Sequence, residues 1–460
     1  SNSLGSNLGG SAEIGYKHEF GENHNIDISA SYNTWGRENE DIYYDRYIYP
    51  LYDSSAYQKQ VSNMAPDFYN VQVDYVNAFN EKFKLEAGYK ADIQREGSPV
   101  STYAGATEDN LELVEELYND FIYNRDVHAL YATFSGRIDK FGFQVGLRGE
   151  NTKVYTQSLA YGQTVNDVEP YVTSDFDLFP SAFLTYQLPN DNEIQLSYTR
   201  RISRPFGGQL NSFVNISDPL NVSYGNPELT PSYSNALELN YMKMWHNHLA
   251  SASLYYRNTD DVRQRIKYLG ADNVMYTTWE NVTFDKSVGA EFVVKNTFNN
   301  IVDLTTTVNM FYYEIDSFNY FIPEVQKYVT GDASSDFSWN ARLIASVNIP
   351  KVISIQVTGR YNARQVVAQG YREPGYSLDI GIRKSFGDLS FSLSGRDILN
   401  SRKMHNISYG EGFMQETNSR RGGWQVGLTV TYGFGNMKAK KNPNMGGDSI
   451  QVNDGYSEEY

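Results

Sequence analysis

Few residues in this sequence have the types and spacing that catalysis or metal binding requires. His246 and His248 suggest a metal-binding pair, but they fall in a short predicted turn, where a solvated pair is the simpler interpretation. Asp260 and Asp261 lie in a long predicted connection and either bind calcium or remain solvated charges. Zinc-protease, P-loop and nucleophile-elbow motifs are absent, as is Cys. We therefore expect no catalytic residues, no metal and no cofactor, and we interpret the protein as not an enzyme.

Charged residues at alternate positions are more informative than these isolated groups. Basic and acidic side chains share the polar faces of many segments, which predicts a wet interior wall of mixed charge. Such a wall suits hydrogen bonding to an internal plug, and a simply hydrated wall is an equal alternative. The net charge of −16 argues against nucleic acid as a partner. The arginines predicted to face this interior are Arg148, Arg201, Arg257, Arg342, Arg360 and Arg383.

Alternation with a period of two residues is the dominant pattern of the chain, and it predicts strands with one apolar and one polar face. The last segment is an example, with Trp424, Val426, Leu428, Val430, Tyr432 and Phe434 on one face. The segments run for about ten to fifteen residues, against a usual ~5–6 in soluble sheets. Aromatic residues gather at the ends of the apolar faces, as in membrane-interface girdles. A transmembrane antiparallel β-barrel is therefore favoured over a soluble β-sandwich.

Connections between these segments alternate between tight turns and long stretches, which gives the barrel two different ends. The tight turns are expected at 20–24, 79–82, 139–141, 189–192, 246–248, 299–300, 350–351 and 387–388. The long connections are expected at 36–66, 96–124, 157–173, 205–231, 258–284, 316–334, 366–374 and 399–420. Within 96–124, Leu111, Val114, Leu117 and Phe121 recur at helical spacing and predict a short amphipathic helix beginning at Thr107.

This pattern yields about seventeen strands, whereas complete bacterial barrels have an even number and both termini in the periplasm. We therefore expect residues 1–435 to be part of a barrel of about 22 strands, with upstream strands and a plug supplied from the same gene or a separate chain; a miscount of one strand is the alternative. Residues 436–460 are predicted to be a flexible periplasmic tail. The protein should lie in the outer membrane, with long loops outside the cell and tight turns in the periplasm.

Two short motifs carry a family resemblance. Ser203, Arg204 and Pro205 end one predicted strand, and Gly225, Asn226, Pro227, Leu229 and Pro231 precede the next. This pair resembles the barrel of TonB-dependent receptors, and the final strand 423–434 is similar to the signal read by the barrel-assembly machinery. From the residues alone, the motif shapes a loop and restarts a strand, because Pro is tolerated at a strand start; direct ligand contact by Arg204 is the alternative.

The resemblance implies an importer that binds its substrate at extracellular loops and uses the TonB complex, within outer-membrane lipid and lipopolysaccharide. The alternative is a non-transporting scaffold that docks a surface lipoprotein or belongs to a secretion or assembly complex. The substrate is left open.

Overall fold

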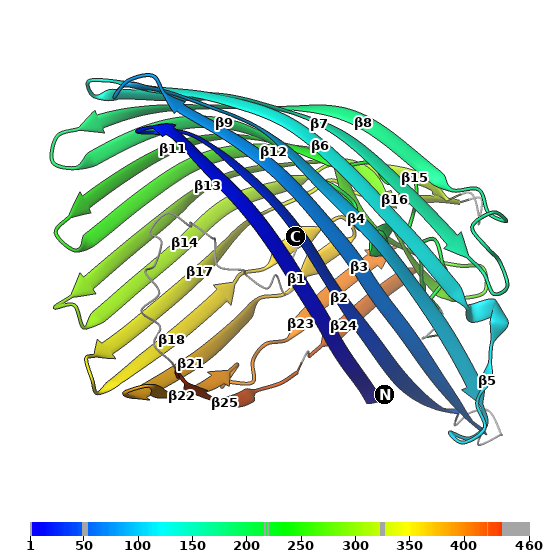
Figure 1. The fold of residues 1–460 in the computed structure, drawn as a ribbon. Helices are drawn as coiled ribbons and strands as arrows, with labels where there is room; N and C mark the ends of the chain where they lie inside the picture. The colour runs from blue at the N-terminus through cyan, green and yellow to red at the C-terminus, as the bar shows by residue number, and fades with distance from the viewer. Residues whose placement is uncertain are drawn as a thin grey trace.

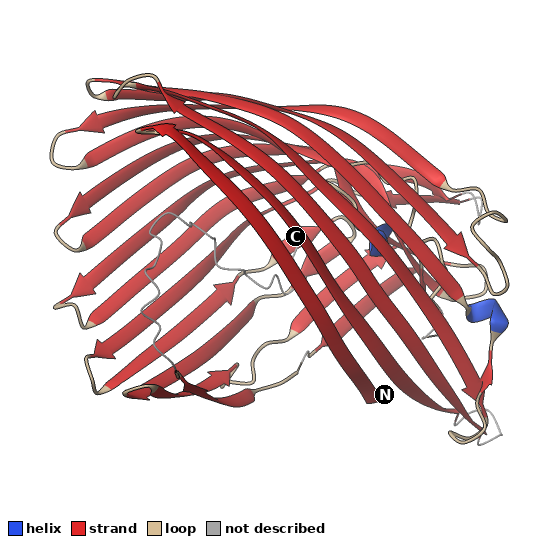
Figure 2. Cartoon of the chain, in the orientation of Figure 1, coloured by secondary structure: helices blue, strands red, loops and turns tan. Residues whose placement is uncertain are grey.

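The computed structural model describes residues 2–47, 54–215, 218, 220–322, 327–420 and 422–434, and antiparallel strands make up nearly all of them (Figure 2). One sheet in this part of the chain contains 19 strands. Two of these are short, β5 (Glu112–Leu113) and β10 (Asn221–Ser223). The other seventeen confirm the prediction: β1 (Asn2–Gly21), β2 (His24–Tyr47), β3 (Ser54–Ala78), β4 (Phe83–Gly105), β6 (Asn119–Ile138), β7 (Phe141–Leu159), β8 (Tyr171–Leu188), β9 (Asn192–Ser203), β11 (Ser232–Trp245), β12 (His248–Leu269), β13 (Met275–Phe298), β14 (Val302–Ile315), β17 (Ser334–Ile349), β18 (Ile353–Asn362), β21 (Gly375–Phe386), β22 (Leu389–Arg396) and β25 (Gln425–Tyr432).

These seventeen strands pair in chain order, each antiparallel to the next. The sheet curls into the wall of a barrel, with β1 and β25 at its two edges (Figure 1). Among the described residues, each of these two edge strands has one partner strand. The fold is thus the transmembrane type of antiparallel β-barrel that the alternation predicted.

All eight tight turns lie where they were predicted, and they gather at one end of the wall (Figure 1). Several depend on residues in the left-handed region of backbone conformation, such as Asn23 (φ 54°), Asp139 (φ 50°) and Gly387 (φ 61°). Asn, Asp and Gly adopt this conformation at the lowest cost, which is why two-residue turns select them.

Two of the predicted long connections are instead mostly regular strand. β2 continues to Tyr47 and β3 begins at Ser54, so the predicted connection 36–66 is largely a paired extension of the sheet. The predicted connection 258–284 likewise contains the continuations of β12 to Leu269 and β13 from Met275. β2 has 24 residues, against the ~9–11 needed to cross a membrane. The wall therefore rises well beyond the bilayer on the side of the long connections.

The predicted amphipathic helix in 96–124 is wrong. β4 runs to Gly105 and β6 starts at Asn119, and between them lie only β5 and a single turn of 3-10 helix, η1 (Glu115–Leu117). The remaining tip is too short for a helix of several turns, because cross-strand pairing takes up the residues on both sides. Phe121, assigned to the helix, is on β6 and is buried.

Other long connections form small sheets of their own. β15 (Phe318–Ile322) pairs with β16 (Lys327–Gly331). A separate four-stranded sheet contains β19 (Gln365–Val367), β20 (Gly370–Arg372), β23 (Met404–Gly410) and β24 (Phe413–Ser419). The connection between β9 and β11 contains α1 (Gly207–Leu210) and β10. The predicted tail, 436–460, lies outside the described residues.

The apolar face of the wall is solvent-exposed in the isolated chain and has the dimensions of a membrane-facing band. On β25, Leu428 is 68% exposed, and the aromatic residues Trp424 and Phe434 flank the band. Ten residues at 3.3 Å each, tilted by ~45°, span roughly 23 Å, close to the ~25 Å apolar band of outer-membrane barrels. The six outward residues predicted for this strand are all exposed: Trp424, Val426, Leu428, Val430, Tyr432 and Phe434. None of the helices in the described ranges is long and apolar enough to cross a membrane.

Candidate functional site at the mouth of the barrel

The connection of residues 204–231, here called the strap, folds against the polar face of the wall. It starts after Ser203, the last residue of β9, and ends at Pro231, directly before β11. The strap contacts strands that are not neighbours in the sheet. A short connection can reach such strands only across the inside of a curved sheet, so the polar face is the concave, interior face. Both family-like motifs are in or beside the strap, and the structure brings them together.

An ion pair holds the beginning of the strap to one side of the wall. Arg204 donates from Nη2 to Glu150 Oε2 at 2.6 Å and to Thr152 Oγ1 at 2.9 Å, both on β7. Glu150 also accepts from Arg148 Nε at 2.5 Å. Asp177 on β8 lies 3.9 Å from Arg204. Arg204 thus anchors the strap two strands away from the strand that precedes it.

Strands on the other flank of the β9–β11 pair hold both ends of the strap. Arg263 on β12 donates to the carbonyl oxygen of Ser203 at 2.7 Å and to its hydroxyl at 2.8 Å. It also donates to the hydroxyl of Ser232 at 3.1 Å. Asn226 donates from Nδ2 to Glu280 Oε2 on β13 at 2.9 Å. In addition, β10 pairs in parallel with β13. The strap is therefore fixed to two separate parts of the barrel.

Gly225 is needed because the backbone is crowded there. Its N–H donates to the carbonyl of Asn211 at 2.8 Å, and the next N–H, of Asn226, donates to the carbonyl of Gln209 at 2.7 Å. A Cβ on Gly225 would lie 2.4 Å from the Gln209 carbonyl oxygen and 2.7 Å from that of Asn211. The glycine thus allows two segments of the strap to approach closely, which is one of the standard uses of this residue.

A small apolar cluster fills the space between the strap and the wall. Leu210 and Leu229 of the strap are buried with Phe121 and Tyr123 of β6, and Trp279 of β13 packs against them. Because β6 and β13 are far apart in the sheet, this cluster bridges the mouth of the barrel. Pro205 and Pro227 lie at the bends of the strap, after β9 and after the Gly225 contact.

The six predicted interior arginines are not brought together into one site. They are distributed over six strands: β7, β9, β12, β17, β18 and β21. Arg342 and Arg360 are cross-strand neighbours, and Arg360 is 3.7 Å from Asp379. Arg383 donates to Ser390 Oγ at 3.5 Å, and Arg257 stacks on the Tyr255 ring at 5.7 Å. Arg148 pairs with Glu150, and Arg201 is exposed on β9 without an ion-pair partner among the described residues.

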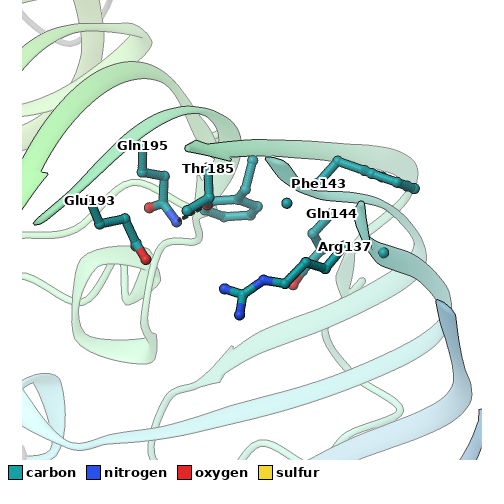
Figure 3. A pocket seen from close by; sticks show the side chains of 9 residues that line it. Arg137, Phe143, Gln144, Thr185, Glu193 and Gln195 are labelled. Carbon is teal, nitrogen blue, oxygen red and sulfur yellow. Dashed lines mark hydrogen bonds between the residues drawn. The ribbon is translucent and has the colours of Figure 1, made fainter. Parts of the chain in front are cut away.

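Two hollows mark the interior wall. One, of about 440 Å³, lies between β6 and β9 close to the tight turns and is lined by Arg137, Gln144, Thr185, Glu193 and Gln195 among others (Figure 3). Gln195 donates to Thr185 Oγ1 there at 3.1 Å. The other, of about 390 Å³, lies beside the strap, and Arg125, Arg148 and Arg204 line it together with Asp92 and Glu150.

A second group of long connections packs into an ordered layer, here called the loop layer, made of β15, β16, β19, β20, β23, β24 and the tips of β12 and β13. Its core contains Ile266, Ile315, Phe318 and Ile322, all nearly fully buried. Lys267 crosses this layer, donating to Gln415 Oε1 at 2.8 Å and to Ser408 Oγ at 3.3 Å. Burial, and then the nearby Arg265, lower the pKa of Lys267.

The isolated groups that the sequence suggested as metal ligands do not assemble into a metal site. His248 is hydrogen-bonded to Asn296 Oδ1 through Nδ1 at 3.0 Å and stacks on Trp245. The carbonyl oxygen of Asp261 accepts hydrogen bonds from Ser232 and Asn281. Within the residues that the structure describes, no group of three or more His, Cys, Asp or Glu could hold a metal ion.

Comparison with known proteins gives one family match and many similar folds. A family model described as an outer membrane protein beta-barrel family matches residues 18–432. No curated protein sequence matches the chain. Three of the similar solved structures are uptake, import or siderophore receptors, and the chain spans less than two thirds of the length of each.

The siderophore receptor PiuA from Acinetobacter baumannii is 10% identical with a TM-score of 0.63, covering 94% of this chain and 65% of that chain. The ferric-catecholate import receptor Fiu from K12 E. coli is 12% identical with a TM-score of 0.61, covering 94% and 64%. The ferric yersiniabactin uptake receptor FyuA from Yersinia pestis is 11% identical with a TM-score of 0.55, covering 90% and 61%. At such identities the likeness concerns the fold.

Proposed function

The chain belongs to the outer membrane protein beta-barrel family, and we propose that it forms the barrel wall of a TonB-dependent-type transporter. The observation that carries the proposal is the run of seventeen strands paired in chain order, which matches the barrels of solved receptors over at least 90% of this chain. The polar interior and the strap across the mouth support it, because a substrate path needs a wet wall and a selective entrance.

Orientation follows from the two ends of the wall. We propose that the tight turns face the periplasm, and that the strap and loop layer face the cell exterior, since bacterial barrels place short turns and long loops in this way. The aromatic and basic residues of this mouth would then meet a solute first. Lipid and lipopolysaccharide would surround the exposed apolar band, and the barrel-assembly machinery would read β25.

The two edge strands carry a further part of the proposal. An unpaired N–H or C=O in hydrocarbon costs several kcal/mol, so barrels in membranes are closed. We propose that additional polypeptide pairs with β1 and β25, completes a barrel of about 22 strands and plugs its lumen. The TonB complex of the inner membrane would supply energy by acting on that plug.

Single-cysteine labelling in intact cells tests the orientation, because the chain has no Cys of its own. Val165 lies in an exposed long connection, and Glu81 lies in the tight turn between β3 and β4. The two variants are Val165→Cys and Glu81→Cys. A membrane-impermeant maleimide should label the first in intact cells and the second only after the outer membrane is permeabilised. The reverse pattern would overturn the proposed orientation.

Gene deletion in the source bacterium tests transport. Mass spectrometry should find at least one solute that wild-type cells deplete from a defined medium and deleted cells do not. A protonophore should stop this depletion, because TonB-type transport draws on the inner-membrane proton gradient. Depletion that is identical in both strains, or one that is indifferent to the protonophore, would contradict energised transport.

A further inference from the structure

The hollow beside the strap is lined by acidic groups that are already paired and by basic groups that still have donors for a ligand. It lies on the interior face of β3, β4, β6 and β7, where Asn70, Asp92, Val127 and Thr152 form one cross-strand row. The neighbouring row contains Phe68, Gln94 and Arg125. Arg204 of the strap closes the hollow from the side, and its volume is about 390 Å³.

The acids of this hollow already have partners. Glu150 is shared by Arg148 and Arg204, and Asp92 lies 3.4 Å from Lys90 of the same strand. Arg125, in contrast, has no carboxylate within 4.0 Å among the described residues, and its buried Nε has no hydrogen-bond partner there. The next acid along β4, Glu96, accepts hydrogen bonds from Gln94 Nε2 at 3.0 Å and from Ser98 Oγ at 3.1 Å.

The guanidinium groups also retain unused donors. Each has five N–H groups in a planar fork. Arg204 uses Nη2 for the strap anchor, while its buried Nε has no partner among the described residues. Arg148 donates to Glu150 from its Nε, so its two Nη groups remain for other acceptors. A planar fork of this kind matches the two oxygens of a carboxylate.

We propose that this hollow, here called the wall pocket, binds the carboxylate of an organic anion through Arg125, Arg148 and Arg204. The amides of Asn70 and Gln94 offer further hydrogen bonds, and Phe68 and Val127 provide an apolar surface for the body of the ligand. The inference rests on the proposed transport function for its physiological meaning, since the occupant would be the anionic group of a solute entering the barrel.

Binding is measured by fluorine NMR with 4-fluorobenzoate as the probe, on the full-length protein purified in detergent, so that the barrel is closed. Arg125→Gln should weaken binding about tenfold or more, because one charged, bidentate partner is lost. Arg125→Lys keeps the charge but not the planar fork of donors. Its affinity for the probe should therefore lie between those of the wild type and Arg125→Gln. Asp92→Asn should tighten binding, because it removes negative charge from the lining.

The matched control is Arg137→Gln, on the same face of β6 but in the other hollow, which should leave the affinity unchanged. Neutral 4-fluorobenzyl alcohol should not bind, and 4-fluorophenyl phosphate distinguishes carboxylate from phosphate as the preferred group. Equal binding of acid and alcohol, stronger binding of the phosphate, or an affinity that Arg125→Gln leaves intact in a folded variant would overturn the proposal. Folding of each variant is checked by the shift of unheated protein on denaturing gels.

This experiment is independent of transport. If the probe binds as expected but gene deletion reveals no transported solute, the wall pocket stands and the proposed function fails. If transport is found but the probe does not bind, the wall pocket is refuted and the proposed function is unaffected.

Discussion

Replacing Gly225 by alanine should loosen the strap without unfolding the barrel. The new Cβ would lie 2.4 Å from the carbonyl oxygen of Gln209 and 2.7 Å from that of Asn211. Neither oxygen is at the end of a flexible side chain, so the backbone itself must move. The backbone conformation of Gly225 is not the left-handed one, since it is absent from the positive-φ residues. The close approach alone therefore predicts the effect.

The cost can be worked out from the two backbone hydrogen bonds at this contact. Moving the chain apart breaks the bond from Gly225 to Asn211 and the bond from Asn226 to Gln209. A net contribution of about 1 kcal/mol each gives a local loss of about 2 kcal/mol. That loss raises the open fraction of the strap about thirtyfold. The anchors on Arg204 and Arg263 lie at the ends of the strap and should persist.

Hydrogen–deuterium exchange measured by mass spectrometry is the assay. Amides of the strap should exchange about thirtyfold faster in Gly225→Ala, while amides of β7 and β8 should keep their rates. Gly97→Ala is the matched control, because a Cβ on Gly97 meets nothing within 4 Å. Unchanged exchange of the strap in Gly225→Ala, or equal acceleration in both variants, would refute the close-approach argument.

Three further substitutions test other parts of the wall. Leu428→Arg on the apolar face should destabilise the barrel in lipid vesicles by about 2–4 kcal/mol in urea titrations, whereas Thr429→Arg on the interior face should cost far less. Gly88→Ala should lower the melting temperature, because a Cβ there would lie 2.6 Å from the Tyr131 ring, which crosses Gly88 to reach a carboxylate on β3; an unchanged melting temperature would contradict this packing. The lowered pKa of Lys267 means that folding disfavours its charged form, so the loop layer should gain stability as pH rises through the window below 10.5. Lys267→Met should remove this gain, which is measured as the melting temperature between pH 8 and 10.5. An equal dependence of melting temperature on pH in the wild type and in Lys267→Met would contradict the prediction.

The wall itself could be predicted because its determinants are local. A turn such as Gly387–Asp388 is specified by two residues, and the alternation from Trp424 to Phe434 is visible within eleven. Every strand repeats the same rule, since one face meets hydrocarbon and the other a wet interior. Agreement over many strands then fixes the fold class even where single segments are ambiguous.

The helix prediction failed because helical spacing and strand pairing competed for the same residues. Leu111, Val114 and Leu117 have the spacing of one helix face, but the neighbouring segments were already committed to β4 and β6. The backbone of Val114 donates to the carbonyl of Thr102 across the hairpin at 2.8 Å. Periodicity over a dozen residues is weak evidence when a long sheet edge offers these hydrogen bonds instead.

The contacts of the site could not be predicted for a different reason. Alternation assigned Arg148 to the interior face, but it gives neither the height of a residue on the wall nor its partners. Glu150 precedes Arg204 by 54 residues, and Arg263 follows Ser203 by 60. Such distances become contacts only when the strands are placed in register. The motif lies in and beside the strap, and the residues that hold the strap come from three other strands.

Arg204 has two roles in this arrangement, and they are energetically linked. Its side chain anchors the strap through Glu150 and also lines the wall pocket. A carboxylate in the pocket would compete with Glu150 for the same guanidinium group, so a ligand that gains from Arg204 weakens the anchor by a corresponding amount. Thermodynamic linkage makes this reciprocal: the factor by which a bound carboxylate weakens the Arg204–Glu150 contact equals the factor by which breaking that contact strengthens carboxylate binding. Because Arg148 also pairs with Glu150, that carboxylate would keep one partner when Arg204 turns to a ligand. The shared acid thereby lowers the cost of releasing the strap, which an isolated Arg204–Glu150 pair could not do.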